Sequence, residues 1–389
     1  MLKLLLTSCL LLNSYFQCNR AQNQLTLQPD PIFHPANIPS NGQQSKIQVA
    51  LLLDTSNSMD GLIDQAKAQL WKMVNKLAGA KKKQQIAELE IALYEYGNSG
   101  LNAENGYIRM VQPLGKDLDG LSEKLFELRT NGGDEYCGWV IKTATEQLSW
   151  STDPNDLKII VIAGNEPFNQ GKVDYKKSCE AACAKGIVIN TIHCGDRQTG
   201  INSFWMDGAS VCKGKYMIID TDQKVVHIST PYDARMMELS GKMNATYIGY
   251  GSFGEEKKMR QVAQDKNAET YGAANATQRA ASKAKASYSN EDWDIVDASD
   301  RDKDFLKKVD KKDLPKEFQG KSDAELQKEI ERLKADREAI RKEIAELEKK
   351  INTFIAEETK KQTSTQTLDN VLIQAVVDQA KDKGFEFGE

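Results

Sequence analysis

The chain has 389 residues, 28% of them charged, and a formal net charge of −4 at pH 7. This length exceeds that of a typical single domain and leaves room for one sizeable core and a second region. The near-balanced charge, without a long basic patch interleaved with aromatic residues, argues against a nucleic-acid-binding protein.

The amino-terminal residues have the pattern of a secretory signal. Lys3 is followed by an apolar stretch that ends near Phe16 and then by polar residues up to Gln22. We expect cleavage after Ala21, so that residues 1–21 are a signal peptide and the mature chain is exported, to a periplasm or outside the cell. The stretch is too short to span a membrane, and no later stretch is apolar enough to be a transmembrane segment. Residues 22–45, which contain four prolines, predict a flexible tether.

An apolar run from Ile47 to Leu53 ends abruptly in three side chains that carry oxygen, Asp54, Ser56 and Ser58. Such a run predicts a buried strand, and open α/β sheets bind their ligands at the carboxyl ends of strands. One carboxylate and two hydroxyls suit a hard divalent cation, Mg²⁺, Mn²⁺ or Ca²⁺, better than zinc. The alternative is that these residues only cap the helix that follows.

Residues 62–77 have the apolar spacing of an amphipathic helix, which gives the order strand, polar loop, helix. With this order the chain resembles the von Willebrand factor type A (VWA) domain, whose metal-ion-dependent adhesion site (MIDAS) opens with Asp-x-Ser-x-Ser. The resemblance implies an α/β fold, a Rossmann-like, doubly wound and mostly parallel sheet, which we place at residues 46–250. Further apolar strand candidates alternate with helical segments. They are residues 89–94, 157–163, 186–192 and 216–219.

In the VWA family a threonine from a second loop and an aspartate from a third loop complete the metal site. In the second loop of this chain, Asp134 aligns with the threonine if the glycines before it are matched. Glu135 aligns if Gly138 is matched. In the third loop Gly164 and Asn165 stand where the aspartate is usual. One carboxylate is therefore gained and one is lost.

Two carboxylates would remain near an ion of charge +2. We therefore predict that Asp54, Ser56 and Ser58, with Asp134 or Glu135, hold a divalent cation. An extra acidic group beside the ion would repel or replace a carboxylate offered by a partner, so we hypothesise that the ion is more structural than adhesive. The alternative is that metal binding is lost and that these side chains only cap helices and tie the loops together.

Five of the seven cysteines follow the predicted signal peptide: Cys137, Cys179, Cys183, Cys194 and Cys212. The odd number leaves at least one unpaired thiol. Cys194 and Cys212 are a candidate disulfide because both fall near the later strands. Cys179 and Cys183 are four apart on a predicted helix, which does not favour a bridge between them. A zinc site with His193 and Cys194 matches no zinc-module spacing, so small buried core cysteines are favoured.

An enzyme can also be built at the same sheet edge. Cys137 or Cys194 would be the nucleophile, His193 the base, and Glu166 the residue that orients it. A histidine that closes a strand is more often an ordinary loop residue. The phosphate-binding, zinc-protease and hydrolase motifs are absent from the sequence. We therefore expect no catalysis.

The carboxyl-terminal part predicts an all-α extension. Residues 251–315 are a polar helical connector in which Trp293 is expected to dock onto the main domain. Apolar residues from Leu326 to Phe354 recur at steps of four and three, broken only by Arg337, which predicts a coiled-coil helix within residues 316–362. A last helix falls within 363–389. The coiled coil either pairs with a second copy, which gives a homodimer, or folds back against the polar helices of its own chain, with residues 368–380 packing on it.

This arrangement looks like that of exported bacterial VWA-domain proteins with a C-terminal coiled coil. The resemblance implies binding or assembly with a protein partner. We therefore expect an exported binding or scaffold protein. Two alternatives are a thiol- or metal-dependent enzyme and a metal-free structural envelope protein, since fold does not fix function.

Overall fold

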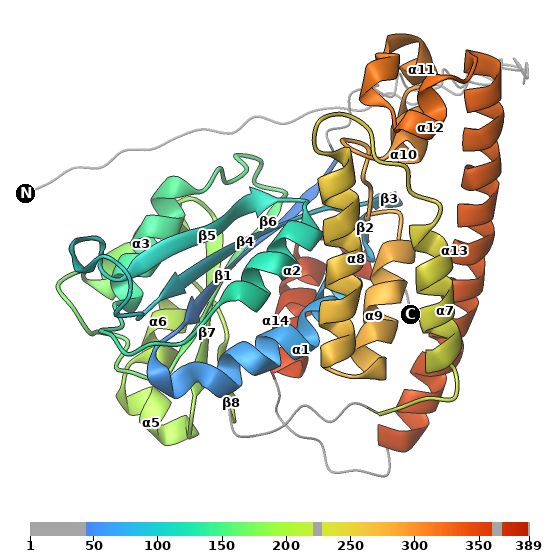
Figure 1. Cartoon of the computed structure of the whole chain (residues 1–389). Helices are drawn as coiled ribbons and strands as arrows, with labels where there is room; N and C mark the ends of the chain where they lie inside the picture. Colours follow the sequence, from blue (N-terminus) through green and yellow to red (C-terminus); the bar gives the residue numbers. More distant parts are fainter. Residues whose placement is uncertain (1–43, 221–227, 360–367, 388–389) are drawn as a thin grey trace, which may run out of the picture. The chain divides into compact units, whose positions relative to one another are not determined.

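The computed structural model describes residues 44–220, 228–359 and 368–387. The predicted signal peptide and nearly all of the predicted tether lie outside these ranges. A six-stranded sheet has the order β5-β4-β1-β6-β7-β8 (Figure 1). Its strands are β1 (Lys46–Asp54), β4 (Glu88–Tyr96), β5 (Ile108–Gly115), β6 (Leu157–Gly164), β7 (Ile187–Cys194) and β8 (Tyr216–Ile219). All neighbours are parallel except β4 and β5. The predicted doubly wound, mostly parallel sheet is confirmed.

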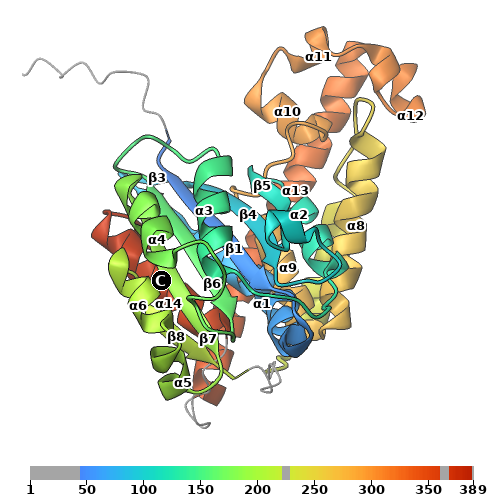
Figure 2. The same ribbon diagram turned by 90° about the vertical axis from the view of Figure 1, so that its left-hand side faces the viewer.

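Helices cover both faces of the sheet because the central strands are apolar on both sides. Leu51 and Leu53 of β1 belong to the core with α1 (Asp60–Leu77) and α2 (Leu118–Glu127). Ala50 and Leu52 belong to the opposite core. Its helices are α3 (Cys137–Gln147), α4 (Tyr175–Ala184) and α6 (Trp205–Val211), which gather over one side of the sheet in Figure 2. A short helix, α5 (Arg197–Asn202), precedes α6.

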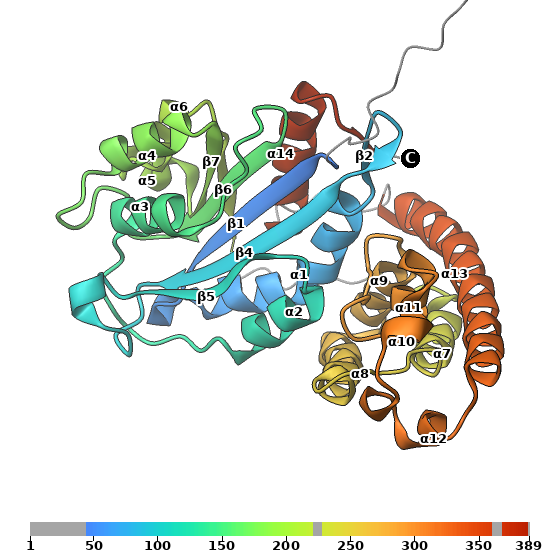
Figure 3. The same cartoon turned by 90° about the horizontal axis from the view of Figure 1, so that it is seen from above.

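A helical region follows β8. It contains α7 (Asp233–Asn244), α8 (Gly254–Thr270), α9 (Ala273–Ala284), α10 (Ile295–Arg301), α11 (Phe305–Lys308), α12 (Lys316–Gln319) and the long α13 (Asp323–Thr359). Figure 3 shows α13 running beside α7, α9 and α10. In the described parts of the chain, no helix is both long and apolar enough to cross a membrane.

The apolar seam of α13 is buried within its own chain. Near its start, Leu326, Ile330 and Leu333 join a core with Ile248 and Ile295. Farther along, three more seam residues enter the core that lies under α1: Ile344, Leu347 and Ile351. The predicted long helix is present. Its seam packs against α7, α9 and α10 of the same chain, which agrees with the predicted folding back against the polar helices, whereas the last helix packs elsewhere.

Arg337, the polar interruption of the seam, is an internal anchor. Its side chain is 2% exposed. Its guanidinium donates to Asp294 and Asp297, each at 2.7 Å, and to the side-chain and backbone oxygens of Thr246 at 2.9 and 2.6 Å. It also lies 3.8 Å from the ring centre of Tyr247. Arg337 therefore fixes α13 to the start of α10 and to the end of α7.

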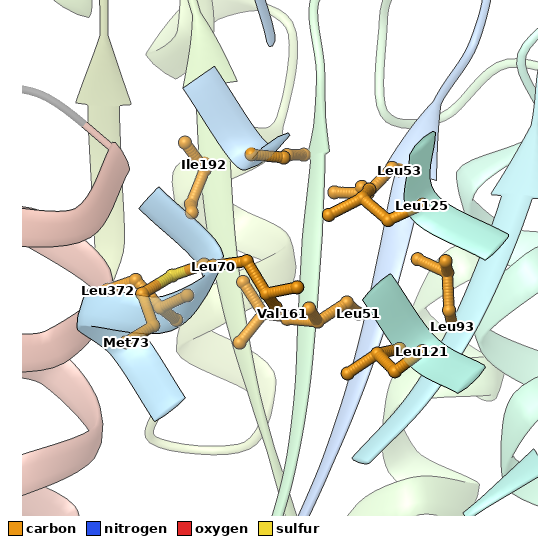
Figure 4. Close-up of a pocket in the computed structure, with 12 residues that line it drawn as sticks. Leu51, Leu53, Leu70, Met73, Leu93, Leu121, Leu125, Val161, Ile192 and Leu372 are labelled. Carbon is orange, nitrogen blue, oxygen red and sulfur yellow. The ribbon is translucent and has the colours of Figure 1, made fainter. Parts of the chain in front are cut away.

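The last helix, α14 (Leu368–Asp382), packs against α1 and β8. Gln379 of α14 exchanges two hydrogen bonds with the buried Asn190 of β7, at 2.9 and 2.7 Å. Leu372 helps to line an apolar cavity between the sheet, α1 and α2 (Figure 4). Every side chain that lines this cavity is apolar, so we expect it to stay dry.

Two short strands add to these contacts: β9 (Glu386–Phe387) pairs with β2 (Ala80–Lys82), which also pairs with β3 (Gln85–Ile86). The contacts of α14 and β9 thus fall on the α/β unit, which we predicted to end at residue 250.

Candidate metal centre

Asp54 is the last residue of β1 and is fully buried at the carboxyl edge of the sheet. One carboxylate oxygen, Oδ1, accepts the backbone N–H of Ser56 at 2.7 Å. The other, Oδ2, has no hydrogen-bond partner. Two glycines at the ends of the neighbouring strands leave room for this carboxylate: Gly97 directly follows β4, and Gly164 is the last residue of β6. A Cβ at Gly97 would lie 2.8 Å from it, and a Cβ at Gly164 would lie 3.0 Å from it.

Of the two second-loop candidates, Glu135 lies beside Asp54 and Asp134 does not. Glu135 is 4% exposed, and its carboxyl group lies close to that of Asp54, because a Cβ at Gly97 would lie 2.7 Å from Cγ of Glu135 and 2.8 Å from Oδ1 of Asp54. Its Oε2 has no hydrogen-bond partner. Asp134 is exposed and accepts a hydrogen bond from the Tyr136 hydroxyl at 3.0 Å. The alignment that matches Gly138 therefore gives the residue that faces β1.

Backbone contacts hold the second loop against the loop that follows β1 and against the loop that follows β4. The N–H of Asn131 donates to the carbonyl of Thr55 at 2.9 Å, and the N–H of Ser99 donates to the carbonyl of Gly132 at 2.6 Å. Gly133 is needed for this close approach, because a Cβ there would lie 2.4 Å from the carbonyl oxygen of Gly97. These contacts bring Glu135 next to the end of β1.

The buried pair has strongly perturbed acidity. Burial, and then the charge of Asp54, raise the pKa of Glu135 to about 9. Burial raises the pKa of Asp54 to about 6, although the hydrogen bond from Ser56 acts in the opposite direction. Two buried carboxylates this close resist ionising together, so the pair shares a proton at neutral pH unless a cation balances its charge.

The rim of the centre carries more oxygen groups. Ser58 is exposed, and its hydroxyl lies 3.3 Å from that of Ser56. The amide of Asn165 donates to the Ser58 hydroxyl at 3.1 Å, while its own Oδ1 has no hydrogen-bond partner. The negative charge of exposed Glu166 raises the pKa of both Asp54 and Glu135. In the sequence we considered Glu166 only as a catalytic residue. Its position directly after Gly164 and Asn165 could have shown that it lies at the rim of this centre.

The donor set fits a hard divalent cation. Among the described residues, no group of three or more His, Cys, Asp or Glu side chains could hold a metal ion. This centre instead offers the carboxylates of Asp54 and Glu135 and the hydroxyls of Ser56 and Ser58. Such oxygen groups are the ligands that Mg²⁺, Mn²⁺ and Ca²⁺ prefer. The capping alternative finds no support at Ser56, whose side chain makes no capping bond to the 3₁₀ turn Asn57–Met59.

The thiols at this edge are not arranged as nucleophiles. Burial raises the pKa of Cys137 and of Cys194 well above the ordinary value, the opposite of activation. His193 is also buried, which lowers its pKa, and its Nδ1 has no hydrogen-bond partner. The Cys137 thiol instead hydrogen-bonds the Tyr96 hydroxyl at 3.8 Å.

The predicted pairing of Cys194 with Cys212 is wrong. All five described cysteines are free. Cys194 belongs to the core under α1, whereas Cys212 belongs to the core on the opposite face of the sheet. The sheet therefore lies between the two thiols.

No protein-family model matches the chain, and no curated protein matches it. Solved structures are similar to part of it. BatB from Bacteroides thetaiotaomicron is 17% identical, with 45% of this chain and 90% of that chain covered and a TM-score of 0.35. The SpRpn10 VWA domain is 15% identical, with 46% and 91% covered and a TM-score of 0.35. Proximal thread matrix protein 1 from the mussel byssus, with a zinc-occupied MIDAS motif, is 12% identical, with 46% and 43% covered and a TM-score of 0.36.

Scores and identities this low add nothing on function. The assignment rests on the strand order and on Asp54, Ser56 and Ser58 at the carboxyl edge of β1. The chain thus has the strand order and the first-loop motif expected of a von Willebrand factor type A fold, with an additional helical region after β8.

Proposed function

We propose that this protein is an exported binding or scaffold protein whose VWA-type head holds one divalent cation, Mg²⁺, Mn²⁺ or Ca²⁺, between Asp54 and Glu135. One observation carries the proposal. Two buried carboxylates face each other, and each keeps an oxygen without a hydrogen-bond partner. A cation of charge +2 would balance both charges and satisfy both oxygens. Ser56 and Ser58 would supply hydroxyl ligands, and Asp134 none.

The ion would join the loops of the centre rather than capture a carboxylate from a partner. Asp54 and Glu135 together already match its charge. Glu166 then adds a further negative charge at the rim. A second carboxylate that approaches this rim would be repelled. The cation therefore has a structural role, and the protein partner would contact other surfaces.

Two segments make up the proposed head, residues 44–220 and 368–387, with residues 228–359 inserted between them. Contacts of α14 with α1 and β8 support this division. The seam of α13 packs against α7, α9 and α10 of its own chain, so we assign no homodimer contact to it. Two apolar side chains at the start of α8 are exposed, Phe253 at 64% and Met259 at 59%, and they suit contact with a protein partner. The proposal that the protein is exported rests on the signal peptide predicted at residues 1–21.

Thermal unfolding of the chain that starts at Gln22 tests the cation. In EDTA the protein should be less stable than with Mg²⁺, Mn²⁺ or Ca²⁺, by about 2.7 kcal/mol when the ion is present at 100 times its Kd. Asp54→Ala should abolish this response, because the fully buried carboxylate is lost. Asp134→Ala is the matched control and should respond as the wild type does. A wild type that ignores both EDTA and cations, or an Asp54→Ala variant that still responds, would contradict the proposal.

A further inference from the structure

Three cysteine thiols meet where α4 ends beside α6, away from the carboxylate pair. Cys179 and Cys183 lie on α4, and Cys212 directly follows α6. The Cys212 thiol donates to the carbonyl oxygen of Cys179 at 2.9 Å. The Cys183 thiol donates to the carbonyl oxygen of Val211, the residue before Cys212, at 3.7 Å. The neighbouring Cys183 thiol adds to the effect of burial in raising the pKa of Cys212.

The three thiols differ in exposure. Cys183 is exposed, whereas Cys179 and Cys212 are buried. Burial raises the pKa of both buried thiols. An oxidant in solution therefore reaches Cys183 first, and the sulfur that lies next to it across the helix interface is that of Cys212.

Other pairings are less favourable. Cys179 and Cys183 stand one turn apart on α4, so their side chains project in the same direction rather than toward each other. Cys194 lies in the core on the other face of the sheet. Cys137 hydrogen-bonds Tyr96 beside the carboxylate pair. Among the described cysteines, only Cys183 and Cys212 combine an exposed thiol with a neighbouring thiol from another part of the fold, the end of α6.

We propose that Cys183 and Cys212 form a disulfide when the chain meets a disulfide oxidant, such as oxidised glutathione or a thiol-disulfide oxidoreductase. The Cys183 thiolate attacks one sulfur of the oxidant, which forms a mixed disulfide and releases one thiolate. The Cys212 thiol then loses its proton and attacks the Cys183 sulfur, which releases the second. Both cysteines are oxidised, and one molecule of oxidant is reduced to two thiols.

The bond would join two helices that also support the third loop of the carboxylate centre. The indole N–H of Trp205, at the start of α6, donates to the backbone carbonyl of Glu166 at 2.9 Å. Lys176, in the first turn of α4, pairs with Asp207 of α6 at 3.1 Å. The disulfide would thus fix one end of a helix pair whose other end holds the Glu166 loop.

The test oxidises the purified chain that starts at Gln22 with oxidised glutathione and maps its peptides without reduction. We expect a peptide that links Cys183 to Cys212. The ring it closes spans about 30 residues, so the melting temperature should rise by roughly 5–10 °C and return with dithiothreitol. Cys183→Ser, a change at an exposed site that should fold normally, should lose both the link and the shift.

Two further variants sharpen the assignment. Cys212→Ser should leave Cys183 as a glutathione adduct without a link, whereas Cys194→Ser should keep the link. A glutathione adduct on wild-type Cys183 without a cross-link would overturn the proposal. A link from Cys183 to Cys179 would do so as well. Neither readout involves a metal, so the result is independent of the proposed cation.

Discussion

Replacing Arg337 with leucine should lower the free energy of unfolding by about 3–5 kcal/mol, the usual cost of breaking a buried ion pair from one side. Its partner Asp294 is fully buried. Burial raises the pKa of Asp294, and the charge of Arg337 is the main effect that opposes it. Without the guanidinium, Asp294 must either keep an unbalanced charge or take up a proton. Urea unfolding at pH 7 measures the change.

Arg332→Leu is the matched control on the same helix. Arg332 is exposed and makes only surface ion pairs with Glu329 and Asp336. Surface pairs contribute little, so this variant should unfold almost as the wild type does. Adding Asp294→Asn to Arg337→Leu should restore part of the lost stability, because a neutral amide at position 294 no longer requires the positive charge of Arg337. Equal losses for Arg337→Leu and Arg332→Leu would show that α13 is not anchored through Arg337.

Without divalent cations, the stability of the protein should fall as the pH rises from about 4 to about 9. The pKa of Glu135 is raised to about 9 and that of Asp54 to about 6, so the folded chain binds protons more tightly than the unfolded chain. Stability falls with pH wherever the folded state holds more protons. We expect a loss of several kcal/mol for this pair, because each unit by which a pKa is raised corresponds to about 1.4 kcal/mol. A saturating cation should reverse it.

Glu135→Gln separates this effect from the other titrating groups. The variant removes one of the two facing carboxyl groups, so its stability in EDTA should depend less on pH above about 6 than that of the wild type. Asp134→Asn, a change at the exposed neighbour, should keep the dependence of the wild type. Urea unfolding at pH 5, 7 and 9 gives all three profiles. Parallel profiles for wild type and Glu135→Gln would show that the pair does not store a proton.

The sheet could be predicted where its strands are continuous apolar runs. Such runs correctly predicted β1, β4, β6, β7 and β8. The edge strand β5 was missed because its residues are half-buried or exposed rather than buried, and because it contains Pro113. An amphipathic pattern shows that one face of a helix is covered, but it does not show by what.

For this reason the heptads of α13 predicted a buried seam but did not decide between two sets of neighbours, a second copy and the polar helices of the same chain. In the sequence Arg337 was only a break in the apolar seam. Its partners Asp294 and Asp297 are distant in the sequence, so no local pattern joins them to it. The same limit applies to α14, whose contact with Asn190 spans 189 positions of the chain.

The candidate centre was predictable only in part. Asp54 and Ser56 follow from a strand that ends in a fixed motif. The choice between Asp134 and Glu135 depends on loop backbone contacts, such as that of Asn131 with Thr55, which leave no periodic signal. Residues 128–136 belong to no helix or strand in the structure. The place of Glu166 at the rim likewise depends on how its loop packs against Trp205.

The most direct test of the cation centre is a Mn²⁺ titration followed by electron paramagnetic resonance, with wild type, Asp54→Ala and Asp134→Ala compared. The signal of free Mn²⁺ reports the number of ions bound to each chain. We predict one tightly bound Mn²⁺ per chain in wild type and Asp134→Ala, and none in Asp54→Ala. Equal Mn²⁺ binding by wild type and Asp54→Ala, or no binding by wild type, would contradict a cation held between Asp54 and Glu135.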